Sequence, residues 1–223
     1  MTTQKLILAA GILLIFTSLF INGCSRKIVL SQDELDYFNE VALGAEYGEV
    51  ESRILKWNNT IRIRVVGEFT EADWLAVETV IADLNRLIQK PQLQLVDNNQ
   101  NVSMYFAPEK EFAMLEPNYV PTNYGFFWTN WYDDNYELYS TTILIASDHI
   151  NQEERSHLIR EELTQSLGLM NDSNQYINSM FYQGWSTTSE FSQLDKKIIR
   201  ALYQPHIKSG MTHSETLQLL VSN

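Results

Sequence analysis

The chain of 223 residues contains little cysteine, proline or glycine: 1, 5 and 9 residues, respectively. One cysteine excludes an intramolecular disulfide, and 44% hydrophobic residues argue against a disordered chain. Cations are scarce as well, since 16 Lys and Arg stand against 28 Asp and Glu, which gives a net charge of −12. Such a chain repels polyanions, so nucleic acid is not an expected partner. The length is typical of one sizeable globular domain.

The N-terminal segment has the pattern of a secretory signal. Lys5 is followed by an apolar run over residues 6–21, and this run ends at Ile21-Asn22-Gly23-Cys24. An aliphatic residue, a small residue and then cysteine form a lipobox-like site, and the only cysteine of the chain stands there. The pattern predicts that residues 1–23 are a lipoprotein signal peptide and that Cys24 is lipidated. An uncleaved anchor is the alternative, because the run approaches the roughly 17–25 residues that span a bilayer.

Lipidation would fix where the protein resides. Acyl chains on the thiol and the amine of Cys24 supply the two signals that stable membrane attachment requires. Residues 24–32 then form a lipidated N-terminus with a short tether, and residues 33–223 form a single domain at the membrane surface. We expect a bacterial cell-envelope protein. Ser25 after the cysteine, in place of Asp, indicates the outer membrane facing the periplasm if the cell is Gram-negative.

Hydrophobic periodicity predicts an α+β domain with a mixed sheet. Helix patterns cover residues 33–43, a long segment between Thr70 and Pro91, and a second long segment that begins at Asn151 and ends near Gly168. Two helices form a C-terminal tail, one over residues 194–202 and one opened by Thr212. Strand patterns cover residues 60–66, 92–96, 102–106, 124–131 and 140–146.

The second long helix has two distinct sides. At about 100° per residue, one side is apolar, and Glu161, Glu162 and Gln165 fall within an arc of about 100° on the other. A solvated helix surface would account for this polar arc. A functional site is the alternative.

The residues from Glu161 to Asp172 carry a resemblance. Glu-Glu-Leu-Thr-Gln-Ser-Leu-Gly-Leu-Met-Asn-Asp resembles the zincin metallopeptidase signature, His-Glu-x-x-His-x-Leu-Gly-Leu followed by a third ligand. In that signature the histidines bind zinc, the glutamate is the general base, and the glycine turns the chain toward the third ligand. The ligand positions here are occupied by Glu161, Gln165 and Asn171. Of the positions to which the signature gives a role at the metal site, only Glu162 and Gly168 match.

A wider set of segments is similar to a bacterial family, domain of unknown function 2927, whose members are mostly described as lipoproteins. It comprises the Glu-Glu-x-x-Gln-x-Leu-Gly-Leu motif, residues 178–182 and residues 202–211, within a resemblance over roughly residues 33–220. The resemblance implies a zincin-like fold, with one long helix after the first strand and the site helix after the last. It also implies that residues 124–131 form an edge strand over a cleft. Residues 178–182, Asn-Ser-Met-Phe-Tyr, are similar to the Met-turn that floors the metal site of metzincins.

The residues that differ from the signature affect whether the site can bind zinc. A neutral amide such as Gln165 is a poor zinc ligand, so no metal cofactor is expected, although zinc stays open. His157 lies one turn before Glu161 on the same face, and these two residues are weak candidates for a metal pair. A hydrogen bond between them is the alternative.

Two functions remain in view. The first is a degenerate, non-catalytic zincin-like domain that binds an extended peptide or an envelope protein in its groove, or acts as a scaffold at the membrane. The second is a metallopeptidase-like hydrolase with non-standard ligands and Glu162 as general base. Residues 119–139 add nine aromatic residues, which could be a binding platform or could pack alternately into the core.

Overall fold

The computed structural model describes residues 27–43 and 53–221, so Cys24 and the predicted signal peptide lie outside the described residues. No helix within these ranges is long and apolar enough to cross a membrane. The elements are, in chain order, α1 (Gln32–Ala42), β1 (Ile61–Gly67), α2 (Glu71–Leu87), β2 (Leu93–Leu95), β3 (Val102–Ala107), η1 (Glu109–Glu111), α3 (Phe112–Leu115), β4 (Gly125–Trp131), β5 (Leu138–Ala146), α4 (Gln152–Gln165), α5 (Gln193–Leu202) and α6 (His213–Leu220).

The five strands form one mixed sheet in the order β2-β1-β3-β5-β4. β1, β2, β3 and β5 are parallel, and β4 runs antiparallel to β5 at the edge. The α+β class, the five strands and the long helices before and after the strand run are therefore confirmed. The 3-10 helix η1 and the four-residue α3 were not predicted, because segments this short have no periodicity to read.

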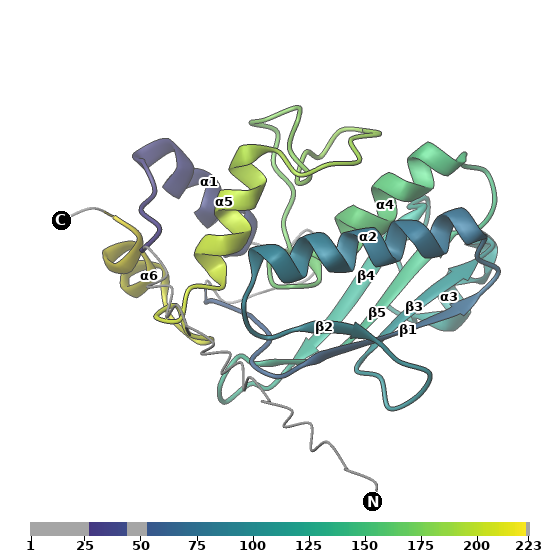
Figure 1. The fold of residues 1–223 in the computed structure, drawn as a ribbon, viewed down its shortest axis with the longest axis horizontal. Helices are drawn as coiled ribbons and strands as arrows, with labels where there is room; N and C mark the ends of the chain where they lie inside the picture. Colours follow the sequence, from purple (N-terminus) through teal and green to yellow (C-terminus); the bar gives the residue numbers. More distant parts are fainter. Residues whose placement is uncertain (1–26, 44–52, 222–223) are drawn as a thin grey trace, which may run out of the picture.

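Helices α2 and α4 lie side by side across one face of the sheet, whereas α1, α5 and α6 gather at one end (Figure 1). The main core lies between these helices and the sheet, and it contains Ile143 and Ile145 of β5. The alternate residues Leu144 and Ala146 belong to a second, smaller core with Phe112 of α3. Because successive side chains of a strand point to opposite faces, α3 covers the other face of the sheet.

Each of the five longest helices begins at a capping box. In each, the N-cap side chain accepts a hydrogen bond from the backbone N–H of the third helical residue. The carboxylate of that third residue in turn accepts a hydrogen bond from the backbone N–H of the N-cap residue. The pairs are Ser31 with Glu34, Thr70 with Asp73, Asn151 with Glu154, Ser192 with Asp195, and Thr212 with Glu215. These local signals are why the predicted helix starts agree closely with the structure.

Buried polar contacts fix α4 against α2. Asp73 is fully buried, accepts from Gln152 Nε2 at 2.9 Å and lies 3.5 Å from Arg155 Nε. Farther along the pair, Arg160 Nη1 lies 2.8 Å from Asp83 Oδ2. A paired charge of this kind tolerates little displacement, so α4 has a defined position over the sheet.

The first described residues join the helical end of the domain. Ile28 N donates to Gln204 Oε1 at 2.8 Å, and Leu30 N donates to Leu220 O at 2.8 Å. Leu30 is buried. Residues 28–31, which sequence assigned to the tether, are thus already part of the fold, because Leu30 adds apolar area to the core beside α6.

Candidate functional site

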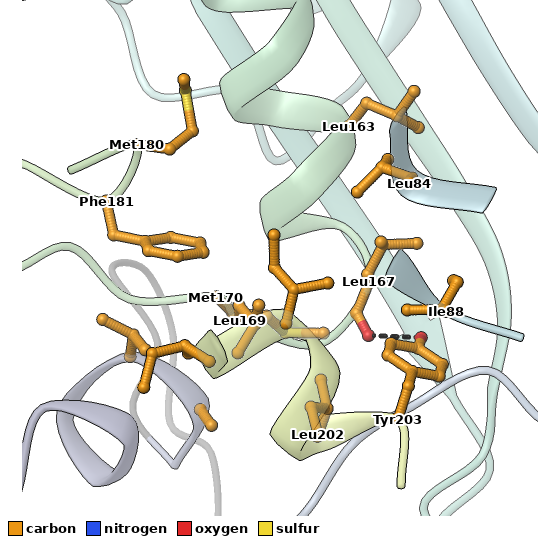
Figure 2. Packing of buried hydrophobic residues seen from close by; sticks show 14 of the residues in the cluster. Leu84, Ile88, Leu163, Leu167, Leu169, Met170, Met180, Phe181, Leu202 and Tyr203 are labelled. Carbon is orange, nitrogen blue, oxygen red and sulfur yellow. Dashed lines mark hydrogen bonds between the residues drawn. The ribbon is translucent and has the colours of Figure 1, made fainter. Parts of the chain in front are cut away.

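The C-terminal end of α4 is anchored in the main core. Leu163 and Leu167 are fully buried and pack beside Leu84 and Ile88 of the α2 segment (Figure 2). The last carbonyls of the helix are bonded as well: Tyr203 Oη donates to Leu167 O at 2.8 Å, and Trp57 Nε1 donates to Ser166 O at 3.0 Å. The orphan acceptors of a helix end are satisfied here by side chains, which makes this end rigid.

Gly168 makes the turn that follows α4. Its φ is +109°, and a Cβ built there would lie 2.0 Å from the carbonyl oxygen of Leu55. A side chain would therefore meet backbone as well as an unfavourable dihedral. The glycine of the signature is required by the path of the chain in this protein.

The segment similar to a Met-turn lies close to this helix end. Met180 and Phe181 are fully buried (Figure 2). Ser179 Oγ donates to Asp195 Oδ1 at 2.5 Å, and Tyr37 Oη bonds Ser179 Oγ at 2.6 Å. Burial raises the pKa of Tyr37. A buried network of this kind holds the turn in one conformation.

A cavity of about 550 Å³ opens between β4, α4 and the loop of residues 182–186. Every residue from 122 to 129 lines it, and so does Trp131. Because side chains of a strand alternate between faces, lining by consecutive residues indicates that the cavity runs along the edge of β4. β4 pairs with β5 on its other side and with no further strand among the described residues.

Helix α4 supplies the polar wall of the cavity. His157, Leu158, Glu161, Glu162 and Gln165 line it, and they repeat at the helical spacing of three and four residues. Glu162 is 6% exposed and Gln165 is 3% exposed. The interpretation of this polar arc as a solvent-exposed helix surface is therefore wrong, because the loop and β4 cover that side of α4.

Glu162 and Gly125 lie in direct contact across the cavity. A Cβ on Gly125 would lie 2.3 Å from Glu162 Oε1 and 2.9 Å from Leu158 Cδ2. The absence of a side chain at the first residue of β4 thus lets α4 and its carboxylate approach the strand.

His157 connects α4 to the loop. It is buried, and its Nδ1 donates to Thr188 O at 2.7 Å, while its Nε2 lies 3.3 Å from Glu161 Oε2. Burial alone would lower the pKa of His157, but the hydrogen bond and charge of Glu161 outweigh it and raise that pKa. Both ring nitrogens face acceptors, an arrangement that favours the imidazolium form.

The residue after Gly168 that joins the polar side chains of α4 is not the one that the signature indicates. Gln165 Nε2 donates to Asp172 Oδ1 at 2.5 Å, and both residues line the cavity. Asn171 does not line it: its Nδ2 donates to Glu40 O at 3.1 Å in α1. The structure therefore brings Glu161, Glu162 and Gln165 together with Asp172 in place of Asn171. The motif register could not show this, since it does not fix which way each side chain points after the turn.

Aromatic side chains form the other walls. Tyr124, Phe127, Trp128 and Trp131 of the edge strand region line the cavity. Trp185 stands at the rim, 60% exposed, and its ring meets Tyr124 edge-on at 6.2 Å between centroids. Both interpretations of the aromatic segment hold in part, because Phe126 and Trp128 pack in the smaller core, whereas Phe127 and Trp131 pack on the α4 side of the strand and border the cavity.

The donors in the cavity do not fit the zinc site of the zincin signature. Glu161 is paired with His157, Gln165 is a neutral amide that donates to Asp172, and Asn171 bonds elsewhere. Zinc in proteins takes imidazole, thiolate or carboxylate ligands in a tetrahedral arrangement. Within residues 27–43 and 53–221, no three His, Cys, Asp or Glu side chains gather closely enough to hold a metal ion.

The fold and the site define an α+β protein with a cavity between an edge strand and a motif-bearing helix. The chain belongs to the family described as "Protein of unknown function (DUF2927)", whose model matches residues 31–222. No curated protein matches the chain. Among solved structures, it is similar to myroilysin, with 13% identity, a TM-score of 0.43, and coverage of 68% of this chain and 83% of that chain.

Proposed function

We propose that this protein is a cell-envelope lipoprotein whose zincin-like domain binds an extended peptide segment of another envelope protein without hydrolysing it. The observation that carries the proposal is the cavity of about 550 Å³ along the edge of β4. A peptide in that cavity would add a strand to the sheet next to β4.

Strand addition needs backbone groups that are accessible in a row. β4 extends over Gly125–Trp131, which is seven residues, and the cavity borders all but one of them. Main-chain hydrogen bonds would supply affinity, and pockets for alternate side chains would supply specificity. Phe127 and Trp131, which pack against the main core on the side of α4, give such pockets apolar walls.

The polar residues of α4 support binding more than hydrolysis. Glu162 occupies the general-base position of the signature, yet Glu161 and Gln165 stand where imidazole ligands would be needed. A hydrolase of this class relies on the metal to lower the pKa of the attacking water, so Glu162 alone does not make the reaction fast. Glu161, Glu162 and Gln165 would then form a polar surface on which a ligand binds.

The membrane attachment is proposed from the sequence pattern that ends at Cys24. The domain begins by Ile28, which bonds Gln204 at the helical end, only four residues after Cys24. A lipid on Cys24 would therefore hold that end close to the bilayer. Replacing Cys24 with Ala should abolish labelling of the protein by a fatty-acid analogue. Unchanged labelling of C24A would refute the attachment site.

Strand addition is tested with backbone-modified peptides. Two seven-residue peptides of the same sequence carry N-methyl groups on alternate residues, one set in the odd positions and the other in the even positions. Because only one edge of an extended peptide can face β4, one set should bind about tenfold or more weakly and the other should match the unmodified peptide. Fluorescence reports binding, since three of the five tryptophans, Trp128, Trp131 and Trp185, line the cavity. Equal loss for both sets, or none, would contradict strand addition.

The hydrolase alternative is tested with the same peptides. Mass spectrometry after incubation with and without zinc should find intact peptide, and the Glu162→Ala protein should behave in the same way. Cleavage that requires both zinc and Glu162 would replace the binding function with the hydrolase. Metal analysis of protein purified without chelator, before and after dialysis against zinc, gives an independent check.

A further inference from the structure

We propose that the ligand is a basic peptide whose lysine or arginine side chain enters the cavity, between the carboxylates of α4 and the aromatic side chains. This inference rests on the proposed function and names the chemistry that the same site selects. It depends on the charges and the rings that line the cavity.

The charges that line the cavity are mostly negative. Glu161, Glu162 and Asp172 contribute carboxylates, and His157 contributes the only side chain that can be cationic among the described residues of its lining. His157 lies 3.3 Å from Glu161, so these two groups offset one another. Three carboxylates against one imidazole give the described part of the lining a net negative formal charge, which disfavours an anionic ligand and favours a cationic one.

Burial strengthens that field. Glu162 is 6% exposed, and Gln165, which donates to Asp172, is 3% exposed. Charges interact several times more strongly near a protein interior than in bulk water. A ligand cation that reaches the α4 wall would therefore be favoured, and a ligand carboxylate would be repelled.

The aromatic residues suit the rest of such a side chain. Lysine and arginine carry apolar stems of three or four methylene groups below the charge, and these pack well on rings. Trp131 and Trp185 line the same cavity as the carboxylates. Ring faces also attract cations, by about 0.5–2 kcal/mol in other proteins. One lysine or arginine side chain could thus pair its charge with the carboxylates and pack its apolar stem against the rings.

A peptide series tests the preference with the full chain in detergent. Three seven-residue peptides differ only at the central residue, which is lysine, norleucine or glutamate. Norleucine keeps the apolar stem and removes the charge. We expect the lysine peptide to bind at least tenfold tighter than the norleucine peptide, and the glutamate peptide to bind most weakly.

Two nearly isosteric variants assign the effect to the cavity. Glu162→Gln and Asp172→Asn should each reduce the lysine-to-norleucine affinity ratio at least threefold and leave the norleucine affinity unchanged. Glu78→Gln is the matched control, since it removes one charge from an exposed position on α2 and should leave the ratio unchanged. Unfolding curves confirm that each variant is folded.

The outcomes separate this inference from the proposed function. Equal binding of the lysine and norleucine peptides would refute the cation preference and leave peptide binding in place. A ratio that falls equally in Glu78→Gln would attribute the preference to net charge and would also overturn the inference. If none of the three peptides binds at millimolar concentration, the proposed function fails together with it.

Discussion

Helix α4 has two sides that differ in kind. Toward the core, Leu163 and Leu167 are fully buried, and Gly168 after the helix passes so close to Leu55 that a Cβ does not fit there. Toward the cavity, Glu161 and Gln165 stand at the ligand positions of the zincin signature. The apolar and glycine positions match the signature while the ligand positions do not. Packing therefore constrains this helix independently of the chemistry on its other side.

The largest expected effect is on the core side, at Gly168. Gly168→Ala should lower the free energy of unfolding by about 3 kcal/mol or more, because it combines an unfavourable φ with a clash against a backbone carbonyl. Urea unfolding measures this loss. Gly184→Ala is the control: its Cβ would meet the ring of Tyr182 at 2.4 Å, but that side chain can rotate away. Equal losses in both variants would contradict the special role of the turn.

A neighbouring pair of substitutions compares the two sides of the helix directly. Leu163→Ala should cost about 2–5 kcal/mol of stability, since it opens a cavity in a fully buried site. Glu162→Gln, one residue earlier, should change stability by less than about 1 kcal/mol because a nearly isosteric side chain remains. Urea unfolding at one pH measures both. A loss at Glu162 as large as that at Leu163 would show that the cavity side also holds the fold together.

The contact between the cavity walls should give a smaller effect. Gly125→Ala is expected to cost about 1–2 kcal/mol, because its Cβ would press on Glu162 and Leu158. The same substitution in a Glu162→Ala background should cost less, since one of the two clashes has been removed. A double-mutant cycle measures the coupling. An unchanged cost would mean that the two walls do not touch through this carboxylate.

The sequence was informative where local rules decide the structure. Capping boxes at Thr70 and Asn151 located the long helices, and alternation over residues 60–66 located β1, because both signals lie within a few residues. Periodicity also gave the order of the elements, and Gly168 marked the end of the second long helix. These features position α4 over the sheet.

The sequence was less informative where distant segments meet. Nothing local indicates that Thr188 accepts from His157, or that Asp172 instead of Asn171 reaches Gln165. The polar arc of α4 looked like a solvated surface because the covering loop comes about twenty residues later. Contacts of this kind depend on tertiary packing, which no window of the sequence contains.

The smallest expected effect concerns the pH dependence of the loop attachment. The pKa of His157 is raised in the folded protein, although burial opposes this, because Glu161 at 3.3 Å stabilises the imidazolium, with a further contribution from Asp172. Between the unfolded value of about 6.5 and the higher folded value, the folded state binds more protons. Stability from this group is therefore complete below about pH 6.5 and is lost as the pH rises through the folded pKa.

A comparison with His157→Gln isolates this contribution. The difference in unfolding free energy between the native protein and the variant should be larger at pH 6 than at pH 8.5 by about 1 kcal/mol, the net size of a typical intramolecular hydrogen bond. His206 contributes in the opposite direction, since burial and nearby lysines lower its pKa, but it is present in both proteins and cancels. A difference that does not change with pH would mean that His157 holds the loop as a neutral ring. The link between α4 and the cavity loop would then be a fixed hydrogen bond to Thr188 with no ionic component from Glu161.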